Sequence, residues 1–233
     1  MKQILAVAFG VWLTMTATGL AQSRNAVVVE LFTSQGCSAC PPADALLSAL
    51  TQDPRVIPLA LHVDYWDYLG WKDIFATPQF SARQKAYARY AREKMVYTPQ
   101  MVIDGKARIV GSRVGELGSA LREAASDPPE VILSLSRNGG NLEIRADAVA
   151  DMNQPLIVQL VRFAKEQDVT IVRGENAGKT LRYHNIVISW KQVGRWSGRA
   201  PLMLTTPADG PEPVVVIVQG EGPAEIFGAA VLE

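Results

Sequence analysis

The first half of the chain alternates short apolar runs with amphipathic segments. The runs from Ala26 to Phe32 and from Val56 to Val63 are rich in β-branched residues, which is typical of buried strands. Apolar residues at helical spacing lie between the two runs: Ala43, Leu46, Leu47 and Leu50. Because Pro41 and Pro42 are tolerated in the first turn of a helix, the pattern predicts a strand, a helix and a second strand in succession.

A second helix is predicted between Pro78 and Lys94. Phe80, Tyr87 and Ala91 share one face of this helix. Its basic residues, among them Arg83, are expected on a solvated face, since such charge runs are usually exposed.

A hairpin and a third helix complete this half of the chain. Two short strands, from Gln100 to Asp104 and from Ala107 to Val110, flank Gly105 and Lys106, which is a two-residue hairpin signal. Val114, Leu117, Leu121 and Ala124 then recur on one helical face. The predicted order up to Ser126 is therefore βαβαββα.

The pattern changes to strands after Asp127, Pro128 and Pro129, which interrupt the chain. The predicted strands are Val131 to Arg137, Leu142 to Ala148, Leu156 to Ala164, Leu181 to Trp190 and Val214 to Gln219. This pattern predicts an antiparallel β-sandwich-like domain over residues 130–233. The expected fold class is α/β for residues 26–126, followed by this C-terminal β domain.

The residues before the first strand have the order of a secretory signal. Lys2 precedes an apolar run from Ile4 to Leu13, and small residues follow up to Ala21. We expect a signal peptide over residues 1–21 and export to a bacterial periplasm or the medium, with no stable membrane span after cleavage. An uncleaved anchor is the alternative, because Ile4 to Leu20 is uncharged and, at about 17 residues, reaches the lower length limit of a spanning helix.

Charge argues against nucleic acid or anionic lipid as partners. Removing residues 1–21 takes away Lys2 alone, which leaves 23 − 1 = 22 basic side chains against 23 acidic ones. The sequence contains no block of lysines and arginines. It therefore predicts no positive electrostatic potential that would attract a polyanion.

The only two cysteines, Cys37 and Cys40, lie two residues apart in FTSQGCSACPP, at the predicted start of a helix. The unpaired N–H groups and partial positive charge of a helix N-terminus favour a thiolate over a thiol. Such sites lower a cysteine pKa from about 8.5 to roughly 3.5–7.5. We expect Cys37 to be the exposed nucleophile and Cys40, shielded in the first turn, to resolve a mixed disulfide.

The combination of CSAC with YTPQMVIDG resembles the thioredoxin superfamily. Thr98 and Pro99 directly precede a predicted strand, as does the Thr-cis-Pro element of that superfamily, which lies against the redox cysteines and presents backbone to an extended substrate. The resemblance therefore implies a thioredoxin-like domain over residues 26–126, with a cis Thr98–Pro99 bond in contact with Cys37.

A closer resemblance covers nearly the whole mature chain. FTSQGCSACPPAD, LHVDYWDYLGWKD and RGENAGKTL are similar to a secreted bacterial family known as domain of unknown function 1223. This family carries no activity with its name, so the resemblance implies none.

The chain also departs from the thioredoxin pattern. The residues between the cysteines are Ser38 and Ala39 instead of Gly-Pro, and no tryptophan precedes Cys37 directly. Thioredoxins carry a buried carboxylate as a proton relay on the strand that leads to their cysteines, and Glu30 lies one residue further away on the corresponding strand. A solvent-facing glutamate is the alternative interpretation of Glu30.

Metal binding and a structural disulfide are the competing interpretations of the cysteine pair. A zinc site usually has four ligands, and only His62, His184 and carboxylates are available to join the cysteines. Copper delivery would use two thiolates, but no methionine cluster accompanies them. A structural disulfide suits an exported protein, although so short a loop constrains the unfolded chain little.

Other conspicuous residues are interpreted as structural. The aromatic side chains Tyr65, Trp66, Tyr68 and Trp71 are expected in packing more than in a groove beside the cysteines. The two histidines are expected as satisfied structural groups. The segment from Gly174 to Lys179 lacks the context of a phosphate loop, so it predicts a turn.

The sequence therefore predicts an exported thiol-disulfide oxidoreductase without a cofactor or bound metal. Its catalytic residues would be Cys37, Cys40, Thr98 and Pro99, and its partners protein or small-molecule thiols and disulfides. The alternatives are a ligand-binding or partner-binding module whose cysteines form a structural disulfide, and a metal-handling protein. Whether the protein oxidises, reduces or isomerises disulfides stays open.

Overall fold

A computed structural model describes residues 20–22 and 26–233. The predicted signal peptide lies outside these residues except for Leu20 and Ala21, which belong to strand β1 (Leu20–Gln22). Among the described residues, no helix combines the length and apolar character needed to cross a membrane.

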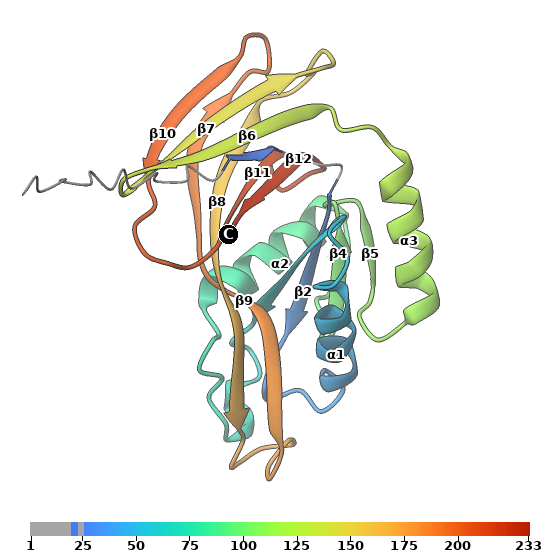
Figure 1. Ribbon diagram of the computed structural model, residues 1–233. Coiled ribbons are helices and arrows are strands. Elements are labelled where there is room, and N and C mark those ends of the chain that lie inside the picture. The colour runs from blue at the N-terminus through green and yellow to red at the C-terminus, as the bar shows by residue number, and fades with distance from the viewer. Residues whose placement is uncertain (1–19, 23–25) are drawn as a thin grey trace, which may run out of the picture.

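The described chain forms a mixed α/β structure with two sheets and three α-helices (Figure 1). The larger sheet has eight strands in the order β12-β11-β8-β9-β3-β2-β4-β5, and the smaller has four in the order β1-β6-β7-β10. This confirms the α/β class at the level of a large sheet with a few helices.

The first half supplies four strands of the large sheet. Strand β2 (Val27–Thr33) pairs in parallel with β3 (Val56–His62) and antiparallel with β4 (Gln100–Ile103), which forms a hairpin with β5 (Ala107–Val110). The turn of this hairpin places Gly105 at φ 71°, with a backbone oxygen of Ala224 where a side chain would lie. The predicted hairpin is therefore present, but its turn has three residues, 104–106, because β4 ends at Ile103 and Asp104 belongs to the turn. Only glycine fits at position 105.

Alternation along β2 sorts its side chains between two layers of helices. Val28 and Phe32 pack with helix α2 (Pro78–Tyr90), whereas Val29 and Leu31 pack with α1 (Pro41–Leu50) and α3 (Val114–Ser126). Because successive side chains of a strand point to opposite faces, both faces of β2 are covered by helices and all of its residues are buried.

The second half is built of strands, as the sequence predicted. These strands are β6 (Val131–Asn138), β7 (Asn141–Ala148), β8 (Leu156–Thr170), β9 (Thr180–Trp196), β10 (Leu202–Pro207), β11 (Val214–Gly220) and β12 (Ile226–Leu232). The hydrophobic pattern missed β10 and β12, and it underestimated the length of β8 and β9. The large sheet contains strands from both sides of the predicted boundary at residues 127–130, because β9 pairs with β3 through Ala60 and Ile186.

The same alternation builds the core between the two sheets. In β11, Val215 and Ile217 face the layer of α2, and Val214, Val216 and Val218 face the four-stranded sheet. One face of the large sheet is therefore covered by α2, and the other by α1 and α3 toward one end and by the small sheet toward the other.

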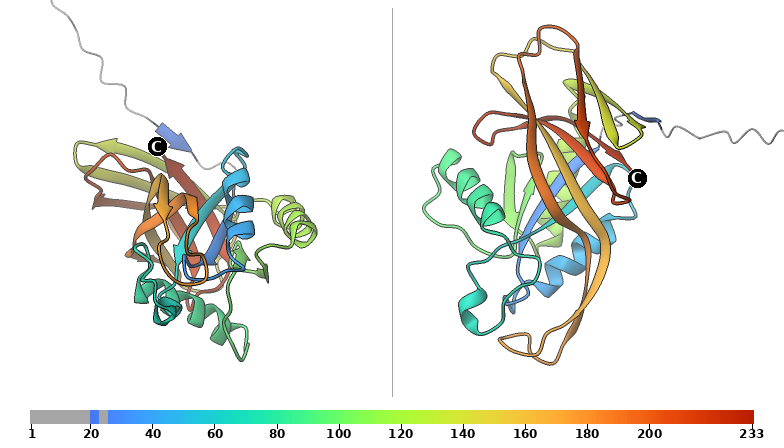
Figure 2. Two further views of the ribbon diagram at one scale, coloured as in Figure 1. Left: turned by 90° about the horizontal axis from the view of Figure 1, so that it is seen from below. Right: turned by 90° about the vertical axis from the view of Figure 1, so that its left-hand side faces the viewer.

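Strands β8 and β9 form a long curved hairpin that runs down beside β3 and α1 (Figure 1) and is seen from two further directions in Figure 2. Its tip, residues 171–179, lies at the end of the molecule where β2 ends and α1 begins. The hairpin thus brings a segment of the second half to the cysteine pair of the first.

A buried ion pair overturns the expectation for Arg83 and excludes the solvent-facing alternative for Glu30. Glu30 has no exposed surface, and its carboxylate accepts hydrogen bonds from Arg83 at 2.6 and 2.8 Å and from the hydroxyl of Tyr87 at 2.5 Å. The Arg83 guanidinium also stacks 3.8 Å from the Trp190 ring centroid. Arg83 is therefore not on a solvated face and Glu30 does not face solvent, because α2 packs directly on this face of the sheet.

Candidate functional site

The cysteine pair occupies the loop between β2 and α1. Cys37 and Cys40 form a disulfide with their Cα atoms 5.4 Å apart. Cys40 immediately precedes the helix, and its carbonyl accepts the Asp44 N–H at 3.1 Å as the first helical turn closes. Pro41 begins the helix, where a missing N–H costs nothing because the first N–H groups of a helix have no partner within it.

Both cysteines are buried, which corrects the expectation that Cys37 would be exposed. Cys37 keeps 2% of its surface and Cys40 none, whereas Ser38 and Ala39 between them are exposed. Trp66 packs so closely beside this loop that a methyl group added at Gly36 would lie 3.2 Å from the Trp66 Cβ. The cysteines are covered by segments distant in sequence. These segments could not be inferred from the position of the cysteines before a helix.

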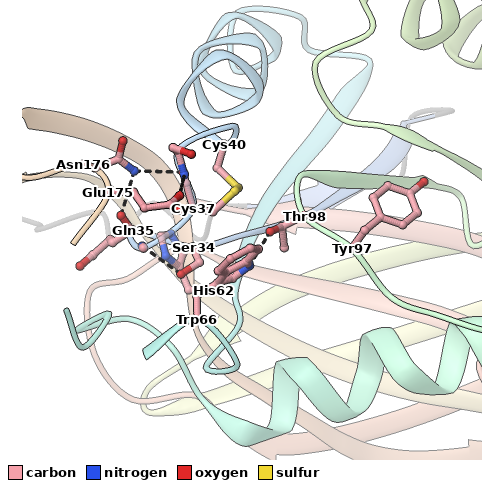
Figure 3. The surroundings of a disulfide bond; sticks show 12 residues. Ser34, Gln35, Cys37, Cys40, His62, Trp66, Tyr97, Thr98, Glu175 and Asn176 are labelled. Carbon is pink, nitrogen blue, oxygen red and sulfur yellow. Dashed lines mark hydrogen bonds between the residues drawn. A yellow bond between two sulfur atoms is a disulfide. The ribbon is translucent and has the colours of Figure 1, made fainter. Parts of the chain in front are cut away.

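The segment that precedes β4 lies on the sulfur side of the loop (Figure 3). The bond between Thr98 and Pro99 is cis, as the sequence predicted. The Trp66 indole donates a hydrogen bond to the Thr98 hydroxyl at 2.7 Å. A methyl group at Gly111 would lie 3.1 Å from Ala43 of α1 and 3.2 Å from Pro99, so Pro99 packs near the first turn of α1. Direct contact between Pro99 and Cys37 stays a prediction.

The tip of the β8–β9 hairpin lies against the other side of the cysteine loop. The buried side-chain amide of Asn176 donates hydrogen bonds to the backbone oxygens of Gln35 and Cys37, each at 3.0 Å. The Ser38 N–H donates to the carboxylate of Glu175 at 3.1 Å (Figure 3). The segment around these residues is a turn, as predicted, but its contact with the cysteines was missed.

A buried histidine and aspartate lie beneath the loop, at the carboxyl end of β3. His62 Nδ1 lies 2.7 Å from a carboxylate oxygen of Asp73, and neither side chain has exposed surface. Burial works to raise the pKa of Asp73, but His62 and the N–H groups of Gln35 and Phe75 outweigh it, so the pKa is lowered. The contact of Nδ1 with Asp73 agrees with the expected structural role of His62. The other ring nitrogen, Nε2, has no hydrogen-bond partner among the described residues.

Asp44 is a second buried carboxyl group at the site. It follows Cys40 by four residues in the first turns of α1, so the two side chains share one face of the helix. Asp44 exposes 8% of its surface, and within the described part of the chain neither carboxylate oxygen makes a hydrogen bond. Burial raises its pKa to about 7, although nearby His62 acts to lower it.

Other buried polar atoms near Asp44 lack partners within the described residues: the hydroxyl groups of Thr33 and Tyr183, and Nε2 of His62. Thr33 ends β2, and the Tyr183 ring lies 5.0 Å from that of His62. A polar cluster that includes a carboxyl group near neutral pKa therefore lies behind Cys40, and such a group can exchange a proton close to neutral pH.

His184 is separate from this cluster. It follows Tyr183 on β9, so its side chain points to the opposite face, where it lies 3.5 Å from Glu166. Over the described residues, no three His, Cys, Asp or Glu side chains are grouped to hold a metal ion.

The fold and the site define a mixed α/β protein with a Cys-x-x-Cys disulfide at the start of a helix. The chain belongs to the family described as "Protein of unknown function (DUF1223)", which matches residues 28–219. The resemblance to this family seen in the sequence is thereby confirmed.

Two solved structures are similar to the chain. Protein AGR_C_4864 from Agrobacterium tumefaciens is 34% identical, with a TM-score of 0.75 over 90% of this chain and 96% of that one. HBP35 of Porphyromonas gingivalis is 13% identical, with a TM-score of 0.61 over 90% of this chain and 75% of that one, and this likeness concerns the fold alone. No curated protein matches the chain.

The structure brings Cys37, Cys40, Thr98 and Pro99 to one end of the large sheet, and it adds residues that the sequence did not single out. Asp44 could have been noticed, because it lies between Cys40 and Leu47 on a buried helical stripe where a carboxylate is unusual. Asn176 and Glu175 gave no such signal, since their role depends on where a distant hairpin folds.

Proposed function

We propose that the protein is an exported thiol-disulfide oxidoreductase with a thioredoxin-like N-terminal domain. The order β2-α1-β3-α2-β4-β5-α3, the parallel β2–β3 pair, the antiparallel β4–β5 hairpin and the cis Thr98–Pro99 bond support this layout. The observation that carries the function is the disulfide at the start of α1, with a buried carboxyl group near neutral pKa one helical turn behind Cys40.

The exchange reaction uses both sulfur atoms in turn. A partner thiolate attacks Sγ of Cys37, a new disulfide forms between partner and Cys37, and the Cys37–Cys40 bond breaks with Cys40 as the leaving thiolate. Asp44 in its protonated form can supply the proton that Cys40 then takes up. In the reverse direction the Asp44 carboxylate accepts that proton, Cys40 attacks Cys37, and the partner leaves as a thiolate.

Attack is assigned to Cys37 because Cys40 has no exposed surface at all. The exposed Ser38 and Ala39 and the Thr98–Pro99 segment on the sulfur side form the surface that a partner would meet first. We further propose that the partners are protein or small-molecule thiols and disulfides, and that the protein acts in the periplasm or the medium.

The burial of both cysteines favours a second candidate, a structural disulfide in a binding module. In that case the hydrogen bonds from Asn176 and to Glu175 simply fasten one loop. The two candidates differ in what the reduced protein does, because a structural pair has no need of asymmetric reactivity.

Trapping of mixed disulfides separates the two candidates. In Cys40→Ser, Cys37 can capture a partner that nothing releases, so mixed disulfides should accumulate in the exporting cell. In Cys37→Ser they should be scarce, which makes this variant the matched control. Acid quenching, non-reducing electrophoresis and identification of the trapped proteins give the readout. If neither variant traps a partner and both lose only stability, the disulfide is structural.

A further inference from the structure

The β8–β9 hairpin tip is held rigidly on the cysteine loop. Asn176 is fully buried, binds two backbone oxygens of the loop and accepts a hydrogen bond from Lys179 at 2.9 Å. Beneath the tip, Gly174 packs on Trp71, whose indole donates to the Gln35 side-chain oxygen at 2.8 Å. These contacts fix the position of the charged residue between Gly174 and Asn176.

That residue is Glu175, whose carboxylate accepts the Ser38 N–H at 3.1 Å. This N–H lies inside the ring that the disulfide closes, four covalent bonds from Sγ of Cys37. Four bonds span at most about 5 Å, so the carboxylate oxygen lies within about 8 Å of that sulfur. The hydrogen bonds with Ser38 lower the pKa of Glu175, so it is negatively charged at neutral pH.

A negative charge here opposes the thiolate that forms when the disulfide is reduced. The thiolate would draw on the partial positive charge at the start of α1 and on N–H groups of the loop before it, and Glu175 already accepts one of these loop N–H groups, that of Ser38. We propose that Glu175 is a positioning residue that sets the reduction potential of the Cys37–Cys40 pair. It makes the reduced protein a stronger reductant than the same active-site loop without the hairpin tip. This inference rests on the proposed function, because it assigns an electrostatic control to the proposed redox pair.

Other charged groups around Cys37 act from different directions and remain when Glu175 is changed. Asp44 lies on α1 behind Cys40, and the His62–Asp73 pair lies beneath the loop from β3 and the following segment. Lys179 lies on the hairpin itself and donates a hydrogen bond to Asn176. A substitution at Glu175 alone therefore isolates its contribution.

The size of the effect follows from the separation. A unit charge up to about 8 Å away, in the partly solvated surroundings of an exposed carboxylate, shifts a thiol pKa by about 0.5–1. A tenfold change in the exchange equilibrium corresponds to about 30 mV for a two-electron couple. Glu175→Gln keeps an acceptor for Ser38 but removes the charge. It should lower the Cys37 pKa by about 0.5–1 and raise the reduction potential by about 15–30 mV.

The test measures two quantities on the mature protein, the Cys37 pKa from the pH dependence of alkylation and the equilibrium with dithiothreitol or glutathione. Glu123→Gln, which changes an exposed glutamate of α3, is the charge-matched control and should alter neither. Asn176→Ala, which releases the tip while keeping Glu175, should shift both in the direction of Glu175→Gln. Raising the salt concentration should shrink the difference between the wild-type protein and Glu175→Gln, since Glu175 is solvent-accessible.

Two failures are distinguishable. If the wild-type protein exchanges disulfides rapidly but Glu175→Gln has the same Cys37 pKa and potential, the proposed role of Glu175 is wrong and the oxidoreductase function stands. If the wild-type protein shows an ordinary thiol pKa and slow exchange, the function itself is wrong, and the inference goes with it.

Discussion

Replacement of Asp44 by asparagine should make the protein progressively more stable relative to the wild type as the pH rises from acid to alkaline values. The substitution keeps the size of the side chain and removes its ability to ionise. Asp44 is 8% exposed, and both of its oxygens lack hydrogen-bond partners within the described residues. Its charged form is therefore disfavoured in the folded state more than in the unfolded chain.

The magnitude follows from the pKa of the folded protein. Burial raises the pKa of Asp44 from 3.8 to about 7, so the folded state binds the proton more tightly than the unfolded state does. At about 1.36 kcal/mol for each pH unit, ionisation costs roughly 4 kcal/mol of unfolding free energy. This cost is absent below about pH 4, grows as the pH rises toward 7, and is constant above that.

The Asp44→Asn variant has no such dependence, but the new side-chain amide must be buried without a partner. That burial costs about 1–3 kcal/mol at every pH, which offsets part of the gain. The informative quantity is therefore the difference in unfolding free energy between variant and wild type as it changes with pH. From about pH 4 to about pH 8 this difference should move by roughly 3–4 kcal/mol in favour of Asp44→Asn.

Urea unfolding of the oxidised proteins at several pH values measures this difference. Asp53→Asn is the control, because the hydrogen bonds of Arg55 lower the pKa of the half-buried Asp53 to about 2. The contribution of Asp53 to the unfolding free energy is fully present above about pH 4 and is lost only as the pH falls through about 2. The difference in unfolding free energy between Asp53→Asn and the wild type should therefore show no trend from about pH 4 to about pH 8. If Asp44→Asn parallels the wild type at all pH values, Asp44 does not carry the assigned pKa.

Three further predictions concern the site and its support. Asp44→Asn should also slow the release of a mixed disulfide by Cys40, with loss of the pH dependence near 7 in rapid-quench kinetics; an unchanged profile would remove Asp44 from the proton transfer. Arg83→Met should destabilise the protein by about 3–5 kcal/mol in urea unfolding, because the buried carboxyl group of Glu30 loses its ion-pair partner, and adding Glu30→Gln should restore most of the loss. A double variant no more stable than Arg83→Met would show that the unpaired charge is not the cause. Trp66→Phe removes the 2.7 Å hydrogen bond to Thr98 and should cost about 1 kcal/mol in the same assay, whereas Tyr68→Phe, which changes an exposed neighbour, should cost little.

Local pattern was sufficient for the elements of the first half and for the place of the cysteines. The strand over Val27–Thr33, the helix that begins at Pro41 and the hairpin around Gly105 follow from alternation, helical spacing and turn chemistry, which act between residues close in sequence. The cis bond before Pro99 was implied by the resemblance of YTPQMVIDG to the Thr-cis-Pro element of the thioredoxin superfamily. These features can be seen in the sequence because each depends on a few consecutive residues.

The surroundings of the cysteines were decided by tertiary structure. Cys37 is buried and Glu30 is paired with Arg83, because helices and strands far apart in sequence pack on the same loop and sheet. Glu175 meets Ser38 across 137 positions of sequence, and β9 reaches β3 only because the long hairpin crosses beside the first half. Hydrophobic periodicity tells which side of a segment is buried but not against what, so the partners of a charge and its pKa become fixed only when distant surfaces meet.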